Sequence, residues 1–268
     1  MTRRIRTALL GVAAALVLVA APAGPSQAAH HDGAPATHTA VAAARHSVTD
    51  RAARTGSAQN ARPATGQPKP VLVPRSTPYR RTGSSAVALT FDDGPDPRWT
   101  PQVLAQLRKR HVKATFCLIG VNVKAHPDLV RRIAADGHTL CNHTMHHDLK
   151  LKTRSRTAIL ADLRATSALI TKASGGVKPT YFRAPGGNWS GVIVSVARTL
   201  GMASLGWGVD PRDWAKPPAS TIVSRVRAGV APGVIVLMHD GGGDRSRSIA
   251  ALKVLLPELT SHYRLTRL

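Results

Sequence analysis

Two adjacent aspartates, Asp92 and Asp93, end a short apolar run in the stretch ALTFDDGPDP. Acidic residues are scarce, with 14 among 268 residues, so a neighbouring pair of them needs a reason. Like charges placed side by side repel each other, and a bound cation removes that cost. One aspartate can then bind a metal ion while the other stays ionised beside it as a base. The pair therefore indicates a metal site with a base next to it.

Two histidines, His143 and His147, stand four residues apart in the stretch CNHTMHHD. On one helical turn, residues i and i+4 share a face, so both imidazoles could reach one ion. Two neutral histidines and one carboxylate leave coordination positions open for water and substrate, as in a catalytic metal site. We therefore expect both histidines to meet an aspartate of the DDG stretch around a divalent metal, with His146 as a bystander.

Three further stretches place ionisable or aromatic side chains where an expected strand ends. These stretches are YFRAPGG with Arg183, GWGVDPRDW with Asp210, Asp213 and Trp214, and VIVLMHDGGG with His239 and Asp240. An apolar strand that stops at His-Asp-Gly fits the mouth of a pocket better than the interior of a core. These groups are therefore candidates for the same site.

The elements that must position these groups alternate between strand and helix. Short apolar runs indicate strands at 87–91, 114–119, 138–142, 180–183, 203–207, 234–238 and 263–267. Apolar residues at helical spacing indicate helices at 100–111, 126–136, 155–173, 190–200, 219–230 and 246–256. This alternation predicts an α/β fold, a small (β/α) barrel with seven or eight parallel strands. The reacting groups of such a barrel lie at the C-terminal ends of its strands.

Five of these short stretches resemble the motifs of the polysaccharide deacetylases of carbohydrate esterase family four, the NodB-like domain. In order along the chain they are TFDDG (Thr90–Gly94), HTMHH (His143–His147), RAPGG (Arg183–Gly187), DPRDW (Asp210–Trp214) and VLMHD (Val236–Asp240). The resemblance covers residues 86–268 and implies a distorted (β/α) barrel with seven or eight strands.

The resemblance also implies a role for each residue of the metal site. Asp93, His143 and His147 would bind a divalent metal, usually zinc and sometimes cobalt or another divalent ion. Asp92 would be the general base, and Arg183 would pair with Asp92 and keep it ionised.

The remaining implied roles concern the leaving group and the acetyl group. His239 would be the general acid, oriented and kept protonated by Asp213. Trp214 and Leu237 would line the pocket for the acetyl methyl group. The backbone N–H of Gly186 is a candidate donor to the oxyanion of the tetrahedral intermediate.

The sequence departs from the family pattern near two of these positions. Many relatives carry tyrosine where this chain has Gly186, so an aromatic wall is absent while the backbone donor remains. Asp148 follows His147 where proline is frequent, and His146 is an additional imidazole. The loss of the aromatic wall weakens any inference about the substrate.

The function implied is metal-dependent removal of N-acetyl groups from polysaccharide that contains N-acetylglucosamine, either peptidoglycan or chitin oligomers. The alternative within the family is O-deacetylation, as in an acetylxylan esterase. A non-catalytic carbohydrate-binding or cell-wall-binding module would lack the base or the acid, and this chain has both Asp92 and His239. A specific nucleic-acid binder fits less well, because aromatic residues make up only 4% of the chain.

Residues 1–29 have the pattern of a signal peptide. Three arginines within the first six residues precede an apolar run and then small residues around Ala28. The apolar run is shorter than the roughly 20 residues of a membrane span. We therefore expect cleavage rather than a retained anchor, and a mature chain without a transmembrane span that is secreted, extracellular or associated with the cell wall.

Residues 30–85 are rich in Ala, Thr, Arg, Pro and Gly and show no lasting period, so we expect a basic, disordered linker. It could tether the catalytic domain, residues 86–268, to an anionic wall polymer, or it could be a passive spacer. Basic residues outnumber acidic ones on both sides of Ala86, and the formal net charge is +23. Such a charge favours anionic surroundings and says nothing about the fold.

The two cysteines, Cys117 and Cys141, lie in two of the expected strands. Export makes a disulfide permissible, and an even number of cysteines is consistent with one. The alternative is a pair of buried free thiols, which pack as small apolar side chains.

Overall fold

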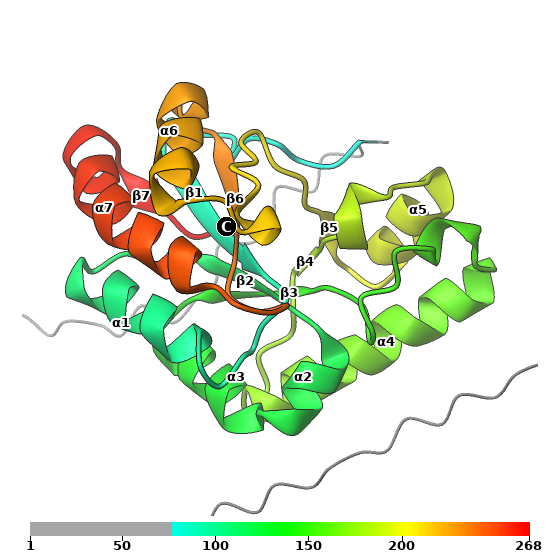
Figure 1. Ribbon diagram of the computed structural model, residues 1–268. Helices are drawn as coiled ribbons and strands as arrows, with labels where there is room; N and C mark the ends of the chain where they lie inside the picture. Colours follow the sequence, from blue (N-terminus) through cyan, green and yellow to red (C-terminus); the bar gives the residue numbers. More distant parts are fainter. Residues whose placement is uncertain (1–76) are drawn as a thin grey trace, which may run out of the picture. The chain divides into compact units, whose positions relative to one another are not determined.

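Seven parallel strands form one curled sheet in the computed structural model, which describes residues 77–268 (Figure 1). The strand order is β5-β4-β3-β2-β1-β6, and β7 pairs with the start of β1. The strands are β1 (Val87–Asp92), β2 (Thr115–Leu118), β3 (Thr139–Asn142), β4 (Tyr181–Phe182), β5 (Ala203–Ser204), β6 (Ile235–His239) and β7 (Leu265–Thr266). The predicted α/β barrel-like fold is confirmed, with seven strands in the described part of the chain.

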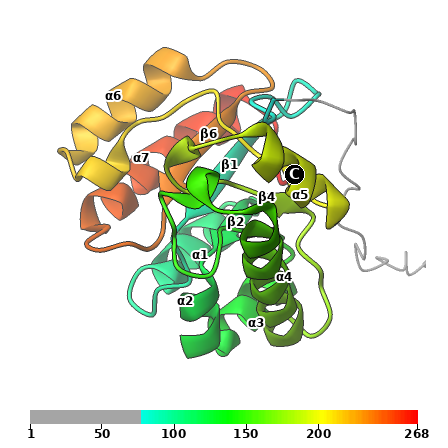
Figure 2. The same ribbon diagram turned by 90° about the vertical axis from the view of Figure 1, so that its right-hand side faces the viewer.

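Seven α-helices of the described residues connect these strands, and most of them pack side by side (Figures 1 and 2). They are α1 (Thr100–Lys109), α2 (Gly120–Ala125), α3 (Pro127–Ala135), α4 (Arg156–Ala173), α5 (Gly191–Thr199), α6 (Ala219–Gly229) and α7 (Ser246–His262). Helix α7 contacts both α6 and α1, and α4 contacts α2, α3 and α5. Their apolar faces cover β1, β2, β3 and β6, whose residues are all buried.

The segment from residue 79 to residue 82, here called the strap, runs between the two ends of the strand order. Tyr79 N–H donates to the Ser204 carbonyl at 2.9 Å, and its carbonyl accepts from Gly206 N–H at 2.8 Å. On the other side, Ile235 N–H donates to the Arg80 carbonyl at 3.2 Å. The strap therefore bridges β5 and β6.

The strap corrects the predicted linker, which was expected to stay disordered up to residue 85. Backbone hydrogen bonds fix the strap, and any residue except proline can form them, so the side-chain pattern carries no sign of it. The predicted signal peptide and the linker up to residue 76 lie outside the described residues.

Two helices differ from the expected ranges. Helix α2 was not predicted, because its six residues are too few to show a helical period. Helix α7 was expected to end at Leu256, before a proline, yet it continues through Pro257 to His262. A proline inside a helix removes one hydrogen bond and need not end the helix. Within residues 77–268, no helix has both the length and the apolarity needed to cross a bilayer.

The two cysteines face each other across β2 and β3. Cys117 and Cys141 are register partners, both fully buried, and the structure joins them in a disulfide. The bridge links β2 to β3, and the loop that follows β3 carries His143 and His147.

Candidate active site

The candidate site lies where β1, β3, β4 and β6 end. The sheet register pairs Asp92 at the end of β1 with His239 at the end of β6 and with Cys117 of β2. Cys117 pairs in turn with Cys141, two residues before His143. Because the strands are parallel and in register, their C-terminal ends bring residues more than one hundred positions apart to the same edge of the sheet.

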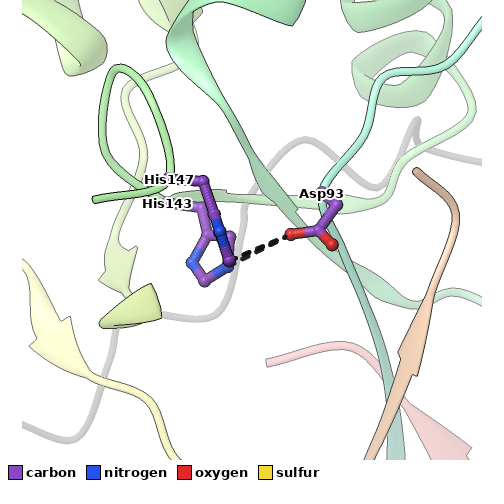
Figure 3. A group of neighbouring side chains, drawn as sticks. All are labelled: Asp93, His143 and His147. Atoms are coloured by element: carbon purple, nitrogen blue, oxygen red, sulfur yellow. Dashed lines mark ion pairs between the residues drawn. The ribbon is translucent and has the colours of Figure 1, made fainter. Parts of the chain in front are cut away.

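Asp93, His143 and His147 form a cluster whose potential ligand atoms all lie within 4.8 Å of one another (Figure 3). Asp93 Oδ1 is 3.5 Å from His143 Nε2 and 3.4 Å from His147 Nε2. This oxygen is buried and has no hydrogen-bond partner. A buried carboxylate oxygen facing two imidazoles fits a divalent cation, because such a cation binds carboxylate and imidazole together and satisfies the otherwise unpaired oxygen.

The two histidines lie in a loop and not on a helical turn, so the reason given for their convergence was wrong. After β3 the chain is irregular, and Thr144 and His147 both have positive φ, at 68° and 54°. The bends bring the two imidazole rings to a centroid separation of 5.0 Å. A spacing of four residues was thus a correct indicator of proximity, although the loop and not helical periodicity produces it.

Arg183 connects the metal cluster to the candidate base. Its backbone carbonyl accepts a hydrogen bond from His143 Nδ1 at 2.8 Å, which turns Nε2 of that ring toward Asp93. Its fully buried guanidinium donates to Asp92 Oδ1 at 2.6 Å, and to Thr90 Oγ1 at 2.9 Å. The carbonyls of Leu205 and Gly206 accept two further bonds. Four hydrogen bonds therefore fix the guanidinium, and one of them fixes the orientation of the Asp92 carboxylate.

His239 forms a second buried pair with Asp213. His239 Nδ1 lies 2.7 Å from Asp213 Oδ1, while the other carboxylate oxygen accepts from His239 N–H at 3.0 Å and from the Ser248 hydroxyl at 2.7 Å. Arg245 donates to the Asp213 backbone carbonyl at 3.2 Å. Ser248 and Arg245 lie on or next to α7 and were missed by the sequence analysis, since nothing in their local sequence connects them to Asp213.

The charges within the site shift several pKa values. Burial by itself lowers the pKa of His239, but the hydrogen bond and charge of Asp213 outweigh burial and raise it. Burial favours a higher pKa for Asp93, yet contacts with His143 and the charges of His239 and His147 hold that pKa well below its usual range. The pKa of His147 is lowered by burial and by the neighbouring His143. His239 is therefore favoured as a proton donor, and Asp93 as a ligand that stays ionised.

A cavity of about 380 Å³ opens directly onto these groups. Its walls are Asp92, Asp93, His143, His147, Leu149, Ala184, Gly186, Trp207, Asp210, Trp214, Leu237 and His239. The three residues expected to line a substrate pocket, Gly186, Trp214 and Leu237, all lie on it. His146 is exposed and does not line the cavity.

Three apolar walls of this cavity were not predicted: Trp207, Leu149 and Ala184. Leu149 is 53% exposed, and its Cδ2 lies 3.0 Å from the place where a Cβ on Gly186 would stand. Gly186 has a φ of 60°, which favours glycine, so Leu149 occupies the space beside a position that cannot readily carry a side chain. Trp207 lies three residues after the end of β5, and its place near a strand end is the signal that could have identified it.

Known proteins of one family resemble this chain. Residues 79–205 match the sequence profile of the family described as polysaccharide deacetylase. A chitooligosaccharide deacetylase of Sinorhizobium fredii is 39% identical over 195 residues, which cover 69% of this chain and 90% of the relative. A peptidoglycan-N-acetylglucosamine deacetylase of Bacillus cereus is 43% identical over 176 residues, covering 65% and 81%.

The fold also matches solved structures. A pseudoenzyme of carbohydrate esterase family four from Bacillus anthracis superposes with a TM-score of 0.67 at 29% sequence identity, covering 72% of this chain and 68% of that one. A relative that is 39% identical and matched over 90% of its own length shows that the chain belongs to the polysaccharide deacetylase family.

Proposed function

We propose that this deacetylase is a secreted, metal-dependent hydrolase that removes the N-acetyl group from N-acetylglucosamine in a polysaccharide, either peptidoglycan or chitin oligomers. Relatives named as deacetylases of chitooligosaccharide and of peptidoglycan N-acetylglucosamine support this substrate class. The observation that carries the proposal is the arrangement around one cavity of the Asp92–Arg183 pair, the Asp93 cluster and the His239–Asp213 pair.

Asp93, His143 and His147 would hold the metal, for which zinc suits the ligand set and cobalt is an alternative. A divalent cation bound there would supply Lewis-acid chemistry that polarises the amide carbonyl and makes the attacking water more acidic. The bond from His143 Nδ1 to the Arg183 carbonyl fixes the tautomer, so that Nε2 is the nitrogen free to coordinate.

Asp92 would accept a proton from the attacking water while the water oxygen bonds to the carbonyl carbon. Arg183 donates to Oδ1 of Asp92, which leaves Oδ2 to take the proton. The oxyanion that forms would accept a hydrogen bond from the Gly186 N–H at the cavity wall.

His239 would then donate its proton to the amide nitrogen as the carbon–nitrogen bond breaks, because an amide nitrogen leaves poorly as an anion. The products are acetate and a free amine on the sugar. Asp213 supports this step by accepting from Nδ1, which directs the labile proton of Nε2 toward the cavity. Trp214 and Leu237 would enclose the acetyl methyl group.

Secretion is proposed from the signal-peptide pattern of residues 1–29, and association with an anionic wall from the net charge of +23. The similarity to a pseudoenzyme raises a non-catalytic role as the contrasting case. Both the candidate base and the candidate acid are present here and face the cavity, which favours an active enzyme.

The test measures acetate release from peptidoglycan, chitin oligomers and acetylxylan in parallel, before and after chelation and with zinc or cobalt added back. We expect release from one or both N-acetylglucosamine polymers, loss with chelator and recovery with metal. Release that resists exhaustive chelation would refute metal dependence. Acetate from acetylxylan alone would identify an O-deacetylase instead.

A further inference from the structure

A second, smaller cavity of about 130 Å³ adjoins the candidate active site. Its walls are Pro78, Arg80, Gly186, Gly187, Trp189, Gly206 and Trp207. Gly186 and Trp207 also line the active-site cavity, so the two cavities are neighbours that share these two residues. A glycan that places one sugar in the first cavity would bring a neighbouring sugar or its substituent to the second.

The aromatic walls of this second cavity are held in place. Trp189 packs edge-on against Phe182 of β4, with ring centroids 5.7 Å apart. The Trp207 ring lies 5.7 Å from the Arg183 guanidinium carbon, and its Cη2 lies 2.7 Å from where a Cβ on Gly187 would stand. Indole rings fixed in this way offer apolar faces against which the C–H groups of a sugar ring can pack.

Arg80 gives the cavity a positive charge. The strap holds its backbone, since its carbonyl accepts from Ile235 N–H, and the side chain passes over Gly206. Arg80 is exposed and takes part in none of the ion pairs found among residues 77–268. The adjacent Arg81 is used differently, since its Nη2 donates to the Pro232 carbonyl at 2.6 Å. Arg80 is thus an exposed arginine with a fixed backbone and, within residues 77–268, no carboxylate partner.

We propose that this second cavity, here called the Arg80 subsite, binds a carboxylate carried by the sugar next to the one that is deacetylated, and so favours an acidic glycan over a neutral one. The inference rests on the proposed function and narrows its substrate class. A guanidinium binds a carboxylate through two parallel hydrogen bonds, and the tryptophans fix the sugar that carries it. In peptidoglycan such a carboxylate belongs to the lactyl ether of the adjacent sugar or to the peptide attached to it, whereas chitin oligomers carry none.

The test uses glycans that differ in whether and where they carry a carboxylate. A peptidoglycan tetrasaccharide with free lactyl carboxylates is compared with the same compound after amidation, and a tetrasaccharide that retains its peptides shows which carboxylate is recognised. The proteins are the full-length chain, Arg80→Gln, Arg80→Lys and, as a matched control, Arg164→Gln. Arg164 is an exposed residue of α4 outside both cavities, so this control loses the same charge elsewhere.

For each protein, kcat/KM for acetate release and the affinity measured by calorimetry are determined for every glycan. For the unaltered protein we expect kcat/KM to be roughly fivefold higher for the carboxylate glycan than for the amide glycan, through a lower KM. Added salt should reduce this preference. The preference should fall close to one in Arg80→Gln and persist in Arg80→Lys and Arg164→Gln. A preference seen only with the peptide-bearing glycan would assign the recognised carboxylate to the peptide.

An equal preference in the natural chain and in Arg80→Gln would overturn the inference, as would equal effects of Arg80→Gln and Arg164→Gln. The binding measurement by calorimetry distinguishes failure of the proposed function from failure of the Arg80 subsite. Binding that prefers the carboxylate and depends on Arg80, without acetate release from any glycan, would refute the proposed function and leave the subsite standing. Acetate release without any preference for a carboxylate would refute the Arg80 subsite and leave the proposed function standing.

Discussion

Arg183 Nη1 lies 2.6 Å from Asp92 Oδ1, with both side chains buried at the centre of the site. The same residue accepts a hydrogen bond from His143 through its backbone carbonyl. One position therefore fixes both the candidate base and a candidate metal ligand, and changes at this position affect folding as well as turnover.

We expect Arg183→Met to lower the free energy of unfolding by about 3–5 kcal/mol, because it leaves the Asp92 carboxylate buried without its partner. The double variant Arg183→Met with Asp92→Asn should regain much of that stability and remain inactive. Urea unfolding of the four proteins forms a complete double-mutant cycle. Additive effects of the two substitutions would contradict the energetic coupling.

Asp92→Asn alone should reduce acetate release by roughly 10²–10⁴-fold, the usual contribution of a general base. Bound metal should stay near its original level, because Asp92 is not one of the three clustered ligands. Acetate assays combined with elemental analysis test both halves of this statement. Full turnover by the variant would rule out Asp92 as the base.

His143→Ala should abolish metal retention, because it removes one of the three clustered side chains. His146→Ala is the matched control, since His146 is exposed and three residues away in the same loop. We expect the control to retain both metal and activity. Metal content after dialysis against a weak chelator distinguishes the variants, and equal losses in both would argue against the cluster.

The pH dependence of activity should report the His239–Asp213 pair. An acid is competent below its pKa, so activity is lost as pH rises through the raised pKa of His239. Asp213→Asn removes the charge that raises this pKa and should move the alkaline limb of kcat/KM to lower pH by about one unit. Ser248→Ala keeps that charge, so kcat should fall while the limb stays in place. An unmoved limb in Asp213→Asn would assign the limb to another group.

His138, which lies outside the site, should make stability depend on pH. Burial lowers its pKa from 6.5 to about 4, with Lys113 adding to the shift and Asp136 opposing it. Between these values the unfolded chain binds a proton that the folded chain does not, so the free energy of unfolding falls as pH drops from about 6.5 to about 4. The loss should approach about 3 kcal/mol at the acid end.

His138→Asn is the comparison for this effect, because asparagine can still accept a hydrogen bond from Ala114 N–H. Unfolding by urea at several pH values, with chelator present throughout, isolates the contribution of His138. We expect a shallower pH dependence in the variant between pH 4 and 6.5. Parallel curves for the two proteins would show that His138 is not the titrating group.

The sequence predicted the parts of the site that depend on strand ends. Asp92 and His239 are the last residues of short strands and Arg183 follows one directly. Parallel strands with one register bring such ends together whatever the sequence between them. The same reasoning predicted the alternating α/β fold with seven or eight strands, of which the described residues form seven.

Features set by loop conformation or by contacts distant in sequence could not be predicted. The bends at Thr144 and His147 place both histidines without any periodic signal. Ser248 reaches Asp213 only because α7 packs where it does, and Leu149 reaches Gly186 only through the fold of its loop. Side-chain patterns record burial along one element, whereas these contacts arise between elements.

The strap has a consequence for where the chain can be shortened. A protein beginning at Ala86 would retain all five motif stretches, yet the Ser204 carbonyl and the N–H groups of Gly206 and Ile235 would lose their partners. Unpaired strand edges recruit strands of other molecules. We expect such a shortened protein to self-associate in solution even though every reacting group is intact. The solubility of this domain would then depend on the strap, which precedes all five motif stretches in the chain.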